Sequence, residues 1–298
     1  MEGTALLDES GFAQRRVTPD EVEEFWADGV VCLREILPLE LITSMERPVA
    51  EALMGEETTD MTELADAMAD GGSDVARDRS ATGMGRFRGG VDHWLVRDEF
   101  RSFALNSAVA EVVAQVLRAS TLRLYEDSVL SKEPGSAHKT VWHQDISYFN
   151  VSGEQLATTW VPLDFADQQS GAMRFVRGSH RWGVVYQPNL FVSNEVIPGA
   201  DGEPVPDIDG SPDQFDIIEF ELGPGDLSIH HAATLHAAGA NRSSRQRRAI
   251  SIRYIGDDAR YLPRPSTIGK PAHRGLNCGD AFTDDAAPVA WQQNRQDC

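Results

Sequence analysis

Apolar and polar residues follow two different periods along the chain, and the change falls near residue 120. Before this point, apolar residues recur every three or four positions, which is typical of amphipathic helices. After it, short runs rich in valine, isoleucine, threonine and aromatic residues are separated by glycine and proline turns, which is typical of strands. The pattern therefore predicts helices first and a β-rich core after them.

The first helix has the clearest boundaries. Thr18 is a good N-cap, Pro19 suits the first helical position, and Glu21 stands three residues after the cap, so the three form a capping box. Asp28-Gly29 ends this helix, and Val30–Leu33 is expected to be a short strand. The dozen residues before the helix are expected to form an extended arm. A second helix is expected from Leu37-Pro38, with an apolar stripe of Leu41, Ile42, Met45, Val49 and Leu53.

The stretch from residue 55 to residue 90 is acidic and rich in glycine. Met54, Met61, Leu64 and Met68 recur in it at helical spacing. We expect them to pack an amphipathic helix, and a methionine-lined lid over a substrate is the alternative. Residues 77–90 are expected to form a loop. Asn106 or Ser107 is expected to cap a further helix that ends at Leu117.

The second half of the chain carries the strand signals. Strands are expected at residues 122–132, 140–149, 156–163, 173–176, 217–222, 227–236 and 248–255. Strict alternation would place Leu122, Leu124, Glu126 and Ser128 on one face of the first of these strands. Residues 184–215 form an acidic insertion with five prolines, which serves either as an active-site lid or as a solvated connector.

These elements predict a single domain over residues 1–298. Its expected parts are a mostly helical segment over residues 1–120, a jelly-roll core over residues 121–256 with the insertion at 184–215, and a C-terminal extension over residues 257–298. The predicted fold class is mainly β with flanking helices.

Composition and charge narrow the class of partner. The chain of 298 residues has a net charge of −20, so nucleic acid and anionic membranes are poor partners. No apolar run approaches the ~20 residues of a membrane span, and the acidic first residues do not resemble a secretory signal. The three cysteines, Cys32, Cys278 and Cys298, are far apart, which fits a reducing cytoplasm. A monomer or a homodimer is expected.

Charge is also distributed unevenly along the chain. Residues 51–78 hold nine acidic residues and one arginine, whereas residues 242–253 hold five arginines and no acid. The arginine-rich stretch is therefore a local exception to the acidic whole.

Candidate metal ligands lie in Trp142-His143-Gln144-Asp145. On a strand, residues two apart share a face, so His143 and Asp145 would point the same way and Gln144 the other. One imidazole and one carboxylate make two thirds of the 2-His-1-carboxylate site of non-heme Fe(II) enzymes. His236 is the best candidate for the third ligand, and His230 and His231 compete with it.

The motifs together resemble the phytanoyl-CoA dioxygenase-like family of Fe(II)/2-oxoglutarate oxygenases. The resemblance runs from about Thr18 to Tyr254. It rests on Trp142-His-Gln-Asp145, the stretch from Ser170 to His180, Leu235-His236, Asn241-Arg-Ser243 and the Arg-Arg-Ala-Ile-Ser-Ile-Arg-Tyr stretch that begins at Arg247. The family's fold is a double-stranded β-helix, also called a jelly roll or cupin-like core, which is the fold that the resemblance implies.

The resemblance also implies a site. Fe(II) would be held by His143, Asp145 and His236, and O2 would take an open position on the iron. The 2-oxoglutarate co-substrate would place its distal carboxylate on Arg247, in preference to the adjacent Arg248, and its body beside Trp160. Many relatives have a serine two residues after the distal histidine, but this chain has Ala238 there. Either Thr234, Thr158 or Thr159 supplies the missing hydroxyl, or the affinity for 2-oxoglutarate is lower.

Further candidate residues are weaker. Tyr125, Glu126, Lys132 and Gln144 are candidate pocket residues, and His180 is expected to structure a loop. The resemblance implies hydroxylation of an aliphatic C–H, because halogenating relatives lack the carboxylate that Asp145 supplies here. Desaturation, cyclisation, a non-catalytic ligand-binding relative and a cupin of other chemistry are the alternatives. Because the chain is acidic, we expect a small or medium-sized substrate without coenzyme A.

Overall fold

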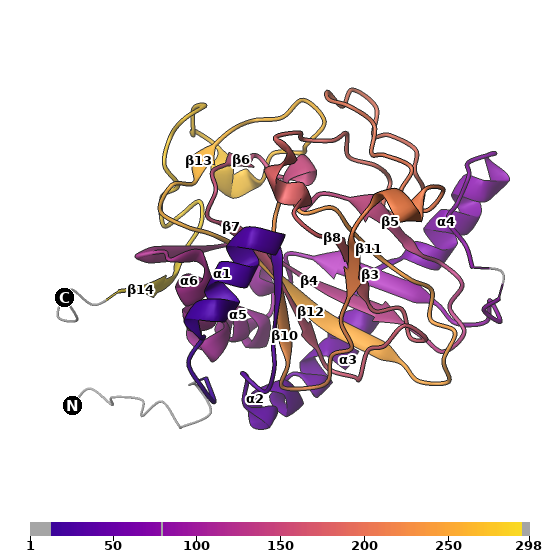
Figure 1. The fold of residues 1–298 in the computed structure, drawn as a ribbon, viewed down its shortest axis with the longest axis horizontal. Coiled ribbons are helices and arrows are strands. Elements are labelled where there is room, and N and C mark those ends of the chain that lie inside the picture. The colour runs from indigo at the N-terminus through magenta and orange to yellow at the C-terminus, as the bar shows by residue number, and fades with distance from the viewer. Residues whose placement is uncertain (1–12, 79, 294–298) are drawn as a thin grey trace.

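The structure is a computed structural model that describes residues 13–78 and 80–293, and Figure 1 shows it as a ribbon. The extended arm expected over the first dozen residues, and Cys298, lie outside the described residues. The helices are α1 (Pro19–Asp28), α2 (Leu39–Ser44), α3 (Glu46–Met54), α4 (Met61–Asp70), α5 (Asp98–Asn106) and α6 (Ala108–Leu117). Among the described residues, no helix is long and apolar enough to cross a membrane.

The predicted first helix is confirmed with its caps. The Glu21 amide donates to the Thr18 hydroxyl, and the Glu21 carboxylate accepts from the Thr18 amide at 2.8 Å. Gly29 ends α1 in the left-handed conformation with φ 78°, which glycine adopts without steric cost. Strand β1 (Val30–Leu33) follows as predicted.

The single helix predicted after Leu37-Pro38 is wrong, because the structure breaks it into α2 and α3 at Met45. Pro48 explains the break. A continuous helix would need an N–H at residue 48 to bond the Ser44 carbonyl, and proline has none. Close to the start of α3, where amides have no intrahelical acceptor, the proline is tolerated.

The methionine stripe is only half right. Met61 and Met68 pack from α4 against a small cluster around Ala65, Phe87 and Val192, whereas Met54 and Leu64 are exposed. The loop predicted over residues 77–90 is also partly wrong, because β3 (Phe87–Val91) occupies its end. Its Phe-Arg-Gly-Gly-Val sequence gives little strand signal, because glycine is rare in strands. Pairing with a long neighbouring strand overrides that preference.

Antiparallel sheets form the core. The remaining strands are β2 (Thr59–Asp60), β4 (Thr121–Lys132), β5 (Thr140–His143), β6 (Val151–Ser152), β7 (Leu156–Pro162), β8 (Met173–Val176), β9 (Ile217–Glu219), β10 (Leu227–His231), β11 (His236–Ala238), β12 (Arg247–Ile255), β13 (Arg260–Tyr261) and β14 (Val289–Gln292). The larger sheet has the order β1-β10-β7-β12-β4-β3-β2, with β14 added on β4, and the smaller sheet has the order β5-β11-β8-β9.

Two apolar layers place the site. The larger layer packs helices α1, α3, α5 and α6 against one face of the large sheet through residues such as Phe25, Val113 and Ile252. The smaller layer lies between the two sheets and includes Trp160, Phe175 and Ala238. A mainly β core with flanking helices is confirmed. Polar side chains such as His143, Asp145 and His236 lie beside this smaller layer.

Strand β4 corrects the predicted alternation. Its pairing with β12 shifts between Arg253 and Tyr254, so one residue of β4 is bulged out of register. As a result Leu122 and Leu124 face the helices, whereas Glu126 and Ser128 face a cavity on the other side. A bulge inserts one residue and reverses the faces beyond it, which alternation alone does not reveal.

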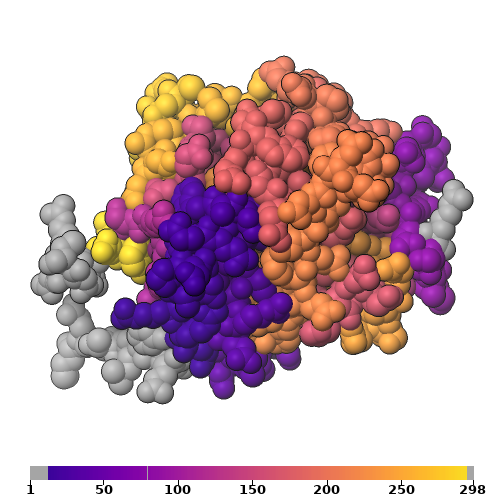
Figure 2. Space-filling model, in the orientation of Figure 1, coloured from indigo at the N-terminus to yellow at the C-terminus, as the bar shows by residue number. Residues whose placement is uncertain are grey.

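The insertion and the C-terminal extension both pack on the core. The insertion has irregular backbone apart from the 3₁₀ turn Pro212–Gln214, and Figure 2 shows it at the surface beside the N-terminal helices. The extension supplies β13, β14 and a 3₁₀ turn at Pro271–His273. Strand β14 pairs with β4, so the end of the described chain is part of the large sheet.

Candidate metal centre and adjoining cavities

Three buried side chains meet between the two sheets. His143 ends β5 and His236 begins β11, and the two residues are direct cross-strand partners. Asp145 begins the 3₁₀ turn Asp145–Tyr148, so the predicted continuous strand over residues 140–149 is wrong beyond His143. One ligand atom from each of the three residues lies within 4.8 Å of the others. The chain therefore gathers the predicted two imidazoles and one carboxylate by a turn instead of by strand alternation.

Hydrogen bonds fix the orientation of both imidazoles. His143 Nδ1 lies 2.8 Å from the Val141 carbonyl, and His236 Nδ1 lies 2.9 Å from the Thr234 carbonyl. A carbonyl only accepts, so each Nδ1 must carry the proton. Each Nε2 then has a free lone pair, and these atoms lie 3.9 and 3.8 Å from Asp145 Oδ1. This arrangement is the one that metal-binding histidines adopt.

The carboxylate is oriented in the same manner. Asp145 Oδ2 accepts from the Thr158 hydroxyl at 2.5 Å and from His230 Nε2 at 3.3 Å. These bonds leave Oδ1 directed at the two free Nε2 atoms. The donor set therefore fits a divalent transition metal bound by one carboxylate oxygen and two neutral imidazoles.

The protonation states agree with this donor set. Burial lowers the pKa of His143 to about 3 and that of His236 to about 4, so both rings are neutral near pH 7. Burial alone would raise the pKa of Asp145, but His236, His230 and Arg253 hold it well below its ordinary value. The three groups are thus ready to bind a cation without losing a proton.

The two competing histidines lie in different surroundings. His230 is fully buried beside the centre, with its ring 4.3 Å from that of His236, but it already donates to Asp145. His231 points to the other side of β10, where its Nε2 contacts the Glu154 carbonyl and its ring contacts His180. His180 lies in that loop region with Trp26 and not at the centre. The structure thus brings His236 alone of the three into the ligand set.

A narrow crevice extends from the centre between the sheets to Arg247. Arg247 and Trp160 line it and are both buried, and the guanidinium carbon lies 5.4 Å from the Trp160 ring centroid. Among the described residues, Arg247 Nε, Arg247 Nη1 and Trp160 Nε1 have no hydrogen-bond partner. Buried unpaired donors are costly, so this end of the crevice is built for an anionic ligand.

The neighbouring Arg248 is the opposite case. It faces away from the crevice and pairs with Asp164 through Nε and Nη2 at 2.9 and 2.8 Å. Of the two adjacent arginines, only Arg247 therefore has donors free for a ligand in the crevice. The crevice holds about 20 Å³ of free space, so a ligand enters by displacing lining side chains. Met173, which lines it, is an unbranched and adaptable side chain.

The hydroxyl groups are placed differently from the sequence expectation. Thr234 donates to the Gly29 carbonyl and Thr159 to the Ile252 carbonyl, so both are engaged outside the crevice. Thr158 lines the crevice but donates to Asp145. Thr140 lines the crevice as well and stands directly opposite Ala238 on the paired strand. Thr140 is thus the hydroxyl nearest in the sheet to the position that Ala238 leaves without one.

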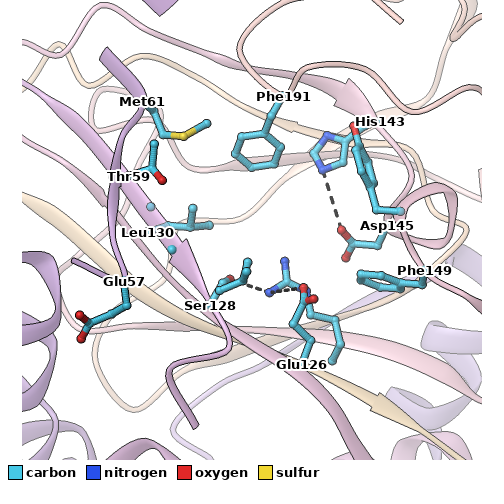
Figure 3. Close-up of a pocket in the computed structure, with 15 residues that line it drawn as sticks. Glu57, Thr59, Met61, Glu126, Ser128, Leu130, His143, Asp145, Phe149 and Phe191 are labelled. Atoms are coloured by element: carbon cyan, nitrogen blue, oxygen red, sulfur yellow. Dashed lines mark hydrogen bonds and ion pairs between the residues drawn. The ribbon is translucent and has the colours of Figure 1, made fainter. Parts of the chain in front are cut away.

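A larger cavity of about 420 Å³ opens on the other side of the centre. Figure 3 shows His143, Asp145 and Phe191 at one side of it and Glu57, Thr59 and Met61 across from them. We call it the main cavity. It shares Leu130, His143, Asp145, Phe191 and Arg253 with the crevice. The two spaces therefore meet at the candidate metal ligands.

Of the four weaker candidates, only Glu126 lines the main cavity. Tyr125 lies in an aromatic cluster with Phe149, and its hydroxyl accepts from the Asn150 amide. Gln144 donates to the Val184 and Ala233 carbonyls and so fastens the insertion to the turn before β11. Lys132 is fully buried and donates to the Gly239 carbonyl at 2.6 Å, and burial lowers its pKa well below the ordinary value. Tyr125, Gln144 and Lys132 therefore stabilise the surrounding strands and loops.

Sequence reasoning missed Phe191 and Arg253. Phe191 belongs to the insertion, lies 5.2 Å from the His143 ring and adopts φ 65°, a left-handed conformation that is strained for an aromatic residue. Asn189 holds it there, because its side-chain oxygen accepts from the Phe191 amide. No local pattern predicts a phenylalanine in this conformation. Arg253 was identified only as part of the arginine-rich stretch, and its inward face depends on the register of β12.

Comparisons with known proteins show the family of the chain. A sequence model of the phytanoyl-CoA dioxygenase (PhyH) family matches residues 25–249. The match covers most of the chain, and the chain therefore belongs to this family of iron- and 2-oxoglutarate-dependent oxygenases.

The curated relatives match over part of their length. The chain is 30% identical over 163 residues to a probable alpha-ketoglutarate-dependent hypophosphite dioxygenase of Stutzerimonas stutzeri, which covers 52% of this chain and 54% of the relative. It is 27% identical over 127 residues to a phytanoyl-CoA dioxygenase of Arabidopsis thaliana, which covers 43% and 42%. The matched region thus spans about half of each relative.

Solved structures show the same fold. The alpha ketoglutarate dependent epimerase SnoN from nogalamycin biosynthesis superposes with a TM-score of 0.65 at 24% identity, over 92% of this chain and 98% of that one. EctD from S. alaskensis superposes with a TM-score of 0.61 at 15% identity, over 91% and 89%. The expected double-stranded β-helix, or cupin-like, core is confirmed.

Proposed function

We propose that the protein is an Fe(II)- and 2-oxoglutarate-dependent dioxygenase that hydroxylates an aliphatic C–H of a small or medium-sized organic metabolite, with release of succinate and CO2. The observation that carries the proposal is the meeting of two cavities at His143 and Asp145, which gather with His236 from the wall of the smaller cavity. One cavity ends at a buried arginine with free donors, and the other is larger and has a mostly apolar lining surface.

His143, Asp145 and His236 would hold the iron, and the crevice would hold 2-oxoglutarate with its distal carboxylate on Arg247. The planar guanidinium offers two parallel N–H donors to a carboxylate, which lysine cannot do. Trp160 would fix the body of the co-substrate, and Thr140 would supply the hydroxyl that Ala238 lacks. Iron with 2-oxoglutarate bound supplies the activation of O2 and the oxidative decarboxylation to succinate.

The chain's own residues orient the metal ligands and limit the access of water to them. Thr158 and His230 keep Asp145 in a single orientation. Phe191 and Phe149 line the main cavity beside the ligands and exclude water from one side. The residues therefore orient the metal and the co-substrate and limit which carbon of a substrate approaches them.

The main cavity also bears on the size of the substrate. Its volume of about 420 Å³ suits a metabolite of drug-like size. Its charged lining residues are Glu57, Glu126, Arg253 and Asp145. The several phosphates of coenzyme A would need a group of cations, and the single arginine does not provide one. We therefore favour a substrate without coenzyme A.

The second candidate outcome is rearrangement of the substrate, such as epimerisation or ring formation. Solved structures with this fold include the epimerase SnoN and the carbocyclase SnoK from nogalamycin biosynthesis. These outcomes would use the same iron site as hydroxylation. Product analysis by mass spectrometry separates them, because hydroxylation adds one oxygen atom and epimerisation adds none.

The test is 2-oxoglutarate-dependent succinate release with a panel of apolar carboxylic acids, their neutral amides and their coenzyme A esters. We expect release that requires Fe(II) and is at least a hundredfold slower in His236→Ala, with His180→Ala as the control at wild-type rate. If the wild-type protein releases succinate no faster than His236→Ala with every compound, the proposed function is contradicted. Saturable turnover of coenzyme A esters with poor turnover of free acids would overturn the substrate class.

A further inference from the structure

Arg253 differs from most arginines of its stretch. Arg242, Arg245 and Arg248 pair with the aspartates at 78, 167 and 164 at 3.6, 2.6 and 2.8 Å. Arg247 and Arg253 lie on the inner face of β12, six residues apart, and both line the crevice. Only Arg253 also lines the main cavity. Arg253 can therefore be reached by a substrate in the main cavity, whereas Arg247 can be reached only by a ligand in the crevice.

The guanidinium of Arg253 is only partly satisfied. Its side chain is 12% exposed, and its Nη1 donates to the Ser128 hydroxyl at 2.5 Å. The nearest carboxylate oxygen, Glu126 Oε1, lies 3.9 Å away, beyond hydrogen-bond distance. Among the described residues, Arg253 Nε is buried without a partner. A charge this deep with free donors is unfavourable unless an acceptor binds there.

Lys270, from the C-terminal extension, explains why Glu126 makes no hydrogen bond to Arg253. Lys270 Nζ lies 2.8 Å from Glu126 Oε2 and 2.7 Å from the Asp92 carboxylate, and its side chain is 18% exposed. Lys270 thereby binds one oxygen of Glu126, and the other oxygen keeps only a long ion pair with Arg253 at 3.9 Å. In Figure 3, Glu126 and Ser128 lie side by side at the same edge of the main cavity. The extension thus limits the pairing of Glu126 with Arg253, whose buried Nε has no partner among the described residues.

The rest of the main cavity is suited to an apolar body. Met61, Leu130, Tyr148, Phe149 and Phe191 line it. Of the lining acids other than the candidate metal ligand Asp145, Glu57 contacts Arg97 and is neutralised by it. The cavity therefore combines an apolar wall, a cation with free donors near the metal ligands, and acids that are already paired.

We propose that the main cavity binds a compact organic anion, whose charged oxygen is held by Arg253 and whose apolar body lies against Phe149 and Phe191. This inference rests on the proposed function, because it names the substrate class of the same site. Carboxylate and sulfonate oxygens share the chemistry that a guanidinium recognises. The Ser128 hydroxyl, already oriented by Arg253, is the second donor available to the same oxygen.

The test uses two fluorescent probes that differ in one group. 1-Anilinonaphthalene-8-sulfonate carries the charge, and N-phenyl-1-naphthylamine has the same aromatic body without it. For Arg253→Gln we expect the Kd of the sulfonate to rise at least tenfold and that of the neutral probe to change less than threefold. The matched control is Arg248→Gln, which removes an arginine from the same strand but from the other face.

Lys270 provides a second and independent variant. In Lys270→Met, Glu126 can turn to Arg253 and neutralise it, so the sulfonate should bind at least fivefold more weakly. In Lys270→Met/Glu126→Gln, the competing acid is gone and sulfonate binding should return to within twofold of wild type. A purely structural role of Lys270 would not give this recovery, because the double variant lacks the whole ion pair.

Three results would overturn the proposal. The first is that the sulfonate does not bind the wild-type protein. The second is that Arg253→Gln weakens the binding of both probes equally, and the third is that it weakens the binding of neither. The proposed function is tested separately by titration of 2-oxoglutarate into the Fe(II) protein without O2. If Arg253→Gln weakens 2-oxoglutarate tenfold but leaves the sulfonate unchanged, Arg253 serves the co-substrate and the proposal fails. If wild type binds the sulfonate but not 2-oxoglutarate, the proposed function fails instead.

Discussion

Asp145 shows how one residue's neighbours determine its chemistry. Its Oδ2 accepts two hydrogen bonds, from Thr158 and His230, and its Oδ1 faces the two imidazoles. Outer hydrogen bonds of this kind typically change metal affinity by 10- to 100-fold. The orientation of a single carboxylate therefore depends on residues from β7 and β10.

Thr158→Val should weaken Fe(II) binding by about 10- to 100-fold, because valine keeps the shape but cannot donate to Asp145. Thr158→Ser should restore most of the affinity. The measurement is anaerobic titration of Fe(II), with circular dichroism to show that the fold is kept. Thr159→Val is the control, since Thr159 is the adjacent residue of β7 and bonds a backbone carbonyl instead. Equal effects at 158 and 159 would contradict the assigned role.

Arg247 and Arg248 give a matched pair of adjacent cations. Arg247→Lys should raise the half-saturating concentration of 2-oxoglutarate at least tenfold, because an ammonium cannot make the two parallel bonds of a guanidinium. Arg248→Lys should change it less than twofold, since Arg248 bonds Asp164 on the outer face. The measurement is the dependence of succinate release on 2-oxoglutarate concentration. The reverse order of effects would show that the register of β12 at the site has been misassigned.

At this scale the sequence predicted the residues that carry motifs and missed those that depend on packing. His143, Asp145 and His236 stand in recognisable spacing, and the structure brings all three together. Thr140 and Phe191 have no such spacing. Their positions depend on the pairing of β5 with β11 and on an irregular loop, which are both long-range features.

Among the elements, β4 has the greatest effect on the site. A bulge near Tyr125 reverses which residues face the helices and which face the main cavity. One consequence is a buried carboxyl on the helix side, Asp127. Burial raises the pKa of Asp127 to about 7, with Asp92 and Glu126 adding to the effect and Arg253 opposing it. The Trp94 amide donates to this carboxyl.

This raised pKa makes stability depend on pH. Above about pH 4 the unfolded chain ionises Asp127, whereas the folded protein keeps it neutral until about pH 7. The free energy of unfolding should therefore fall as pH rises from 4 to 7 and level off above that. Asp127→Asn should remove this slope and stabilise the protein by on the order of 2 kcal/mol at pH 8. Urea unfolding at pH 5 and pH 8 measures it, and an unchanged slope would contradict the assignment.

Element boundaries were predictable where a cap or a turn marks them. The capping box of α1 and the Ser107 cap of α6 are in the sequence and in the structure. Pro48 indicates the break between α2 and α3. The apolar stripe continues across the break, however, and favours a single helix. Strand β3 was not readable, because its two glycines carry no strand preference and only pairing with β4 orders them.

For the whole molecule, the C-terminal extension is the least expected part of the site. Its sequence has no strong pattern, yet β14 pairs with β4 and Lys270 reaches the main cavity wall. Phe282 and Ala287 pack in the cluster that contains Tyr125 and Phe149. We propose that residues 257–293 belong to the same folding unit as the core and that the chain is one domain.

A chain that ends at residue 256 tests that proposal. It should lose at least about 3 kcal/mol of unfolding free energy, because the removal of one buried phenylalanine alone costs that much. It should also bind the sulfonate probe poorly, since Glu126 would then be free to pair with Arg253. Urea unfolding and probe fluorescence measure the two effects. A truncated chain with wild-type stability would show that the extension is a separate, dispensable segment.

The central claim is that His143, Asp145 and His236 hold iron to which 2-oxoglutarate then binds. The most direct measurement is the visible spectrum of the purified protein without O2, recorded after addition of Fe(II) and again after 2-oxoglutarate. We predict a weak charge-transfer band that needs both additions, disappears in His236→Ala and Asp145→Ala, and persists in His180→Ala. A folded wild-type protein that gives no band with both additions would contradict the claim.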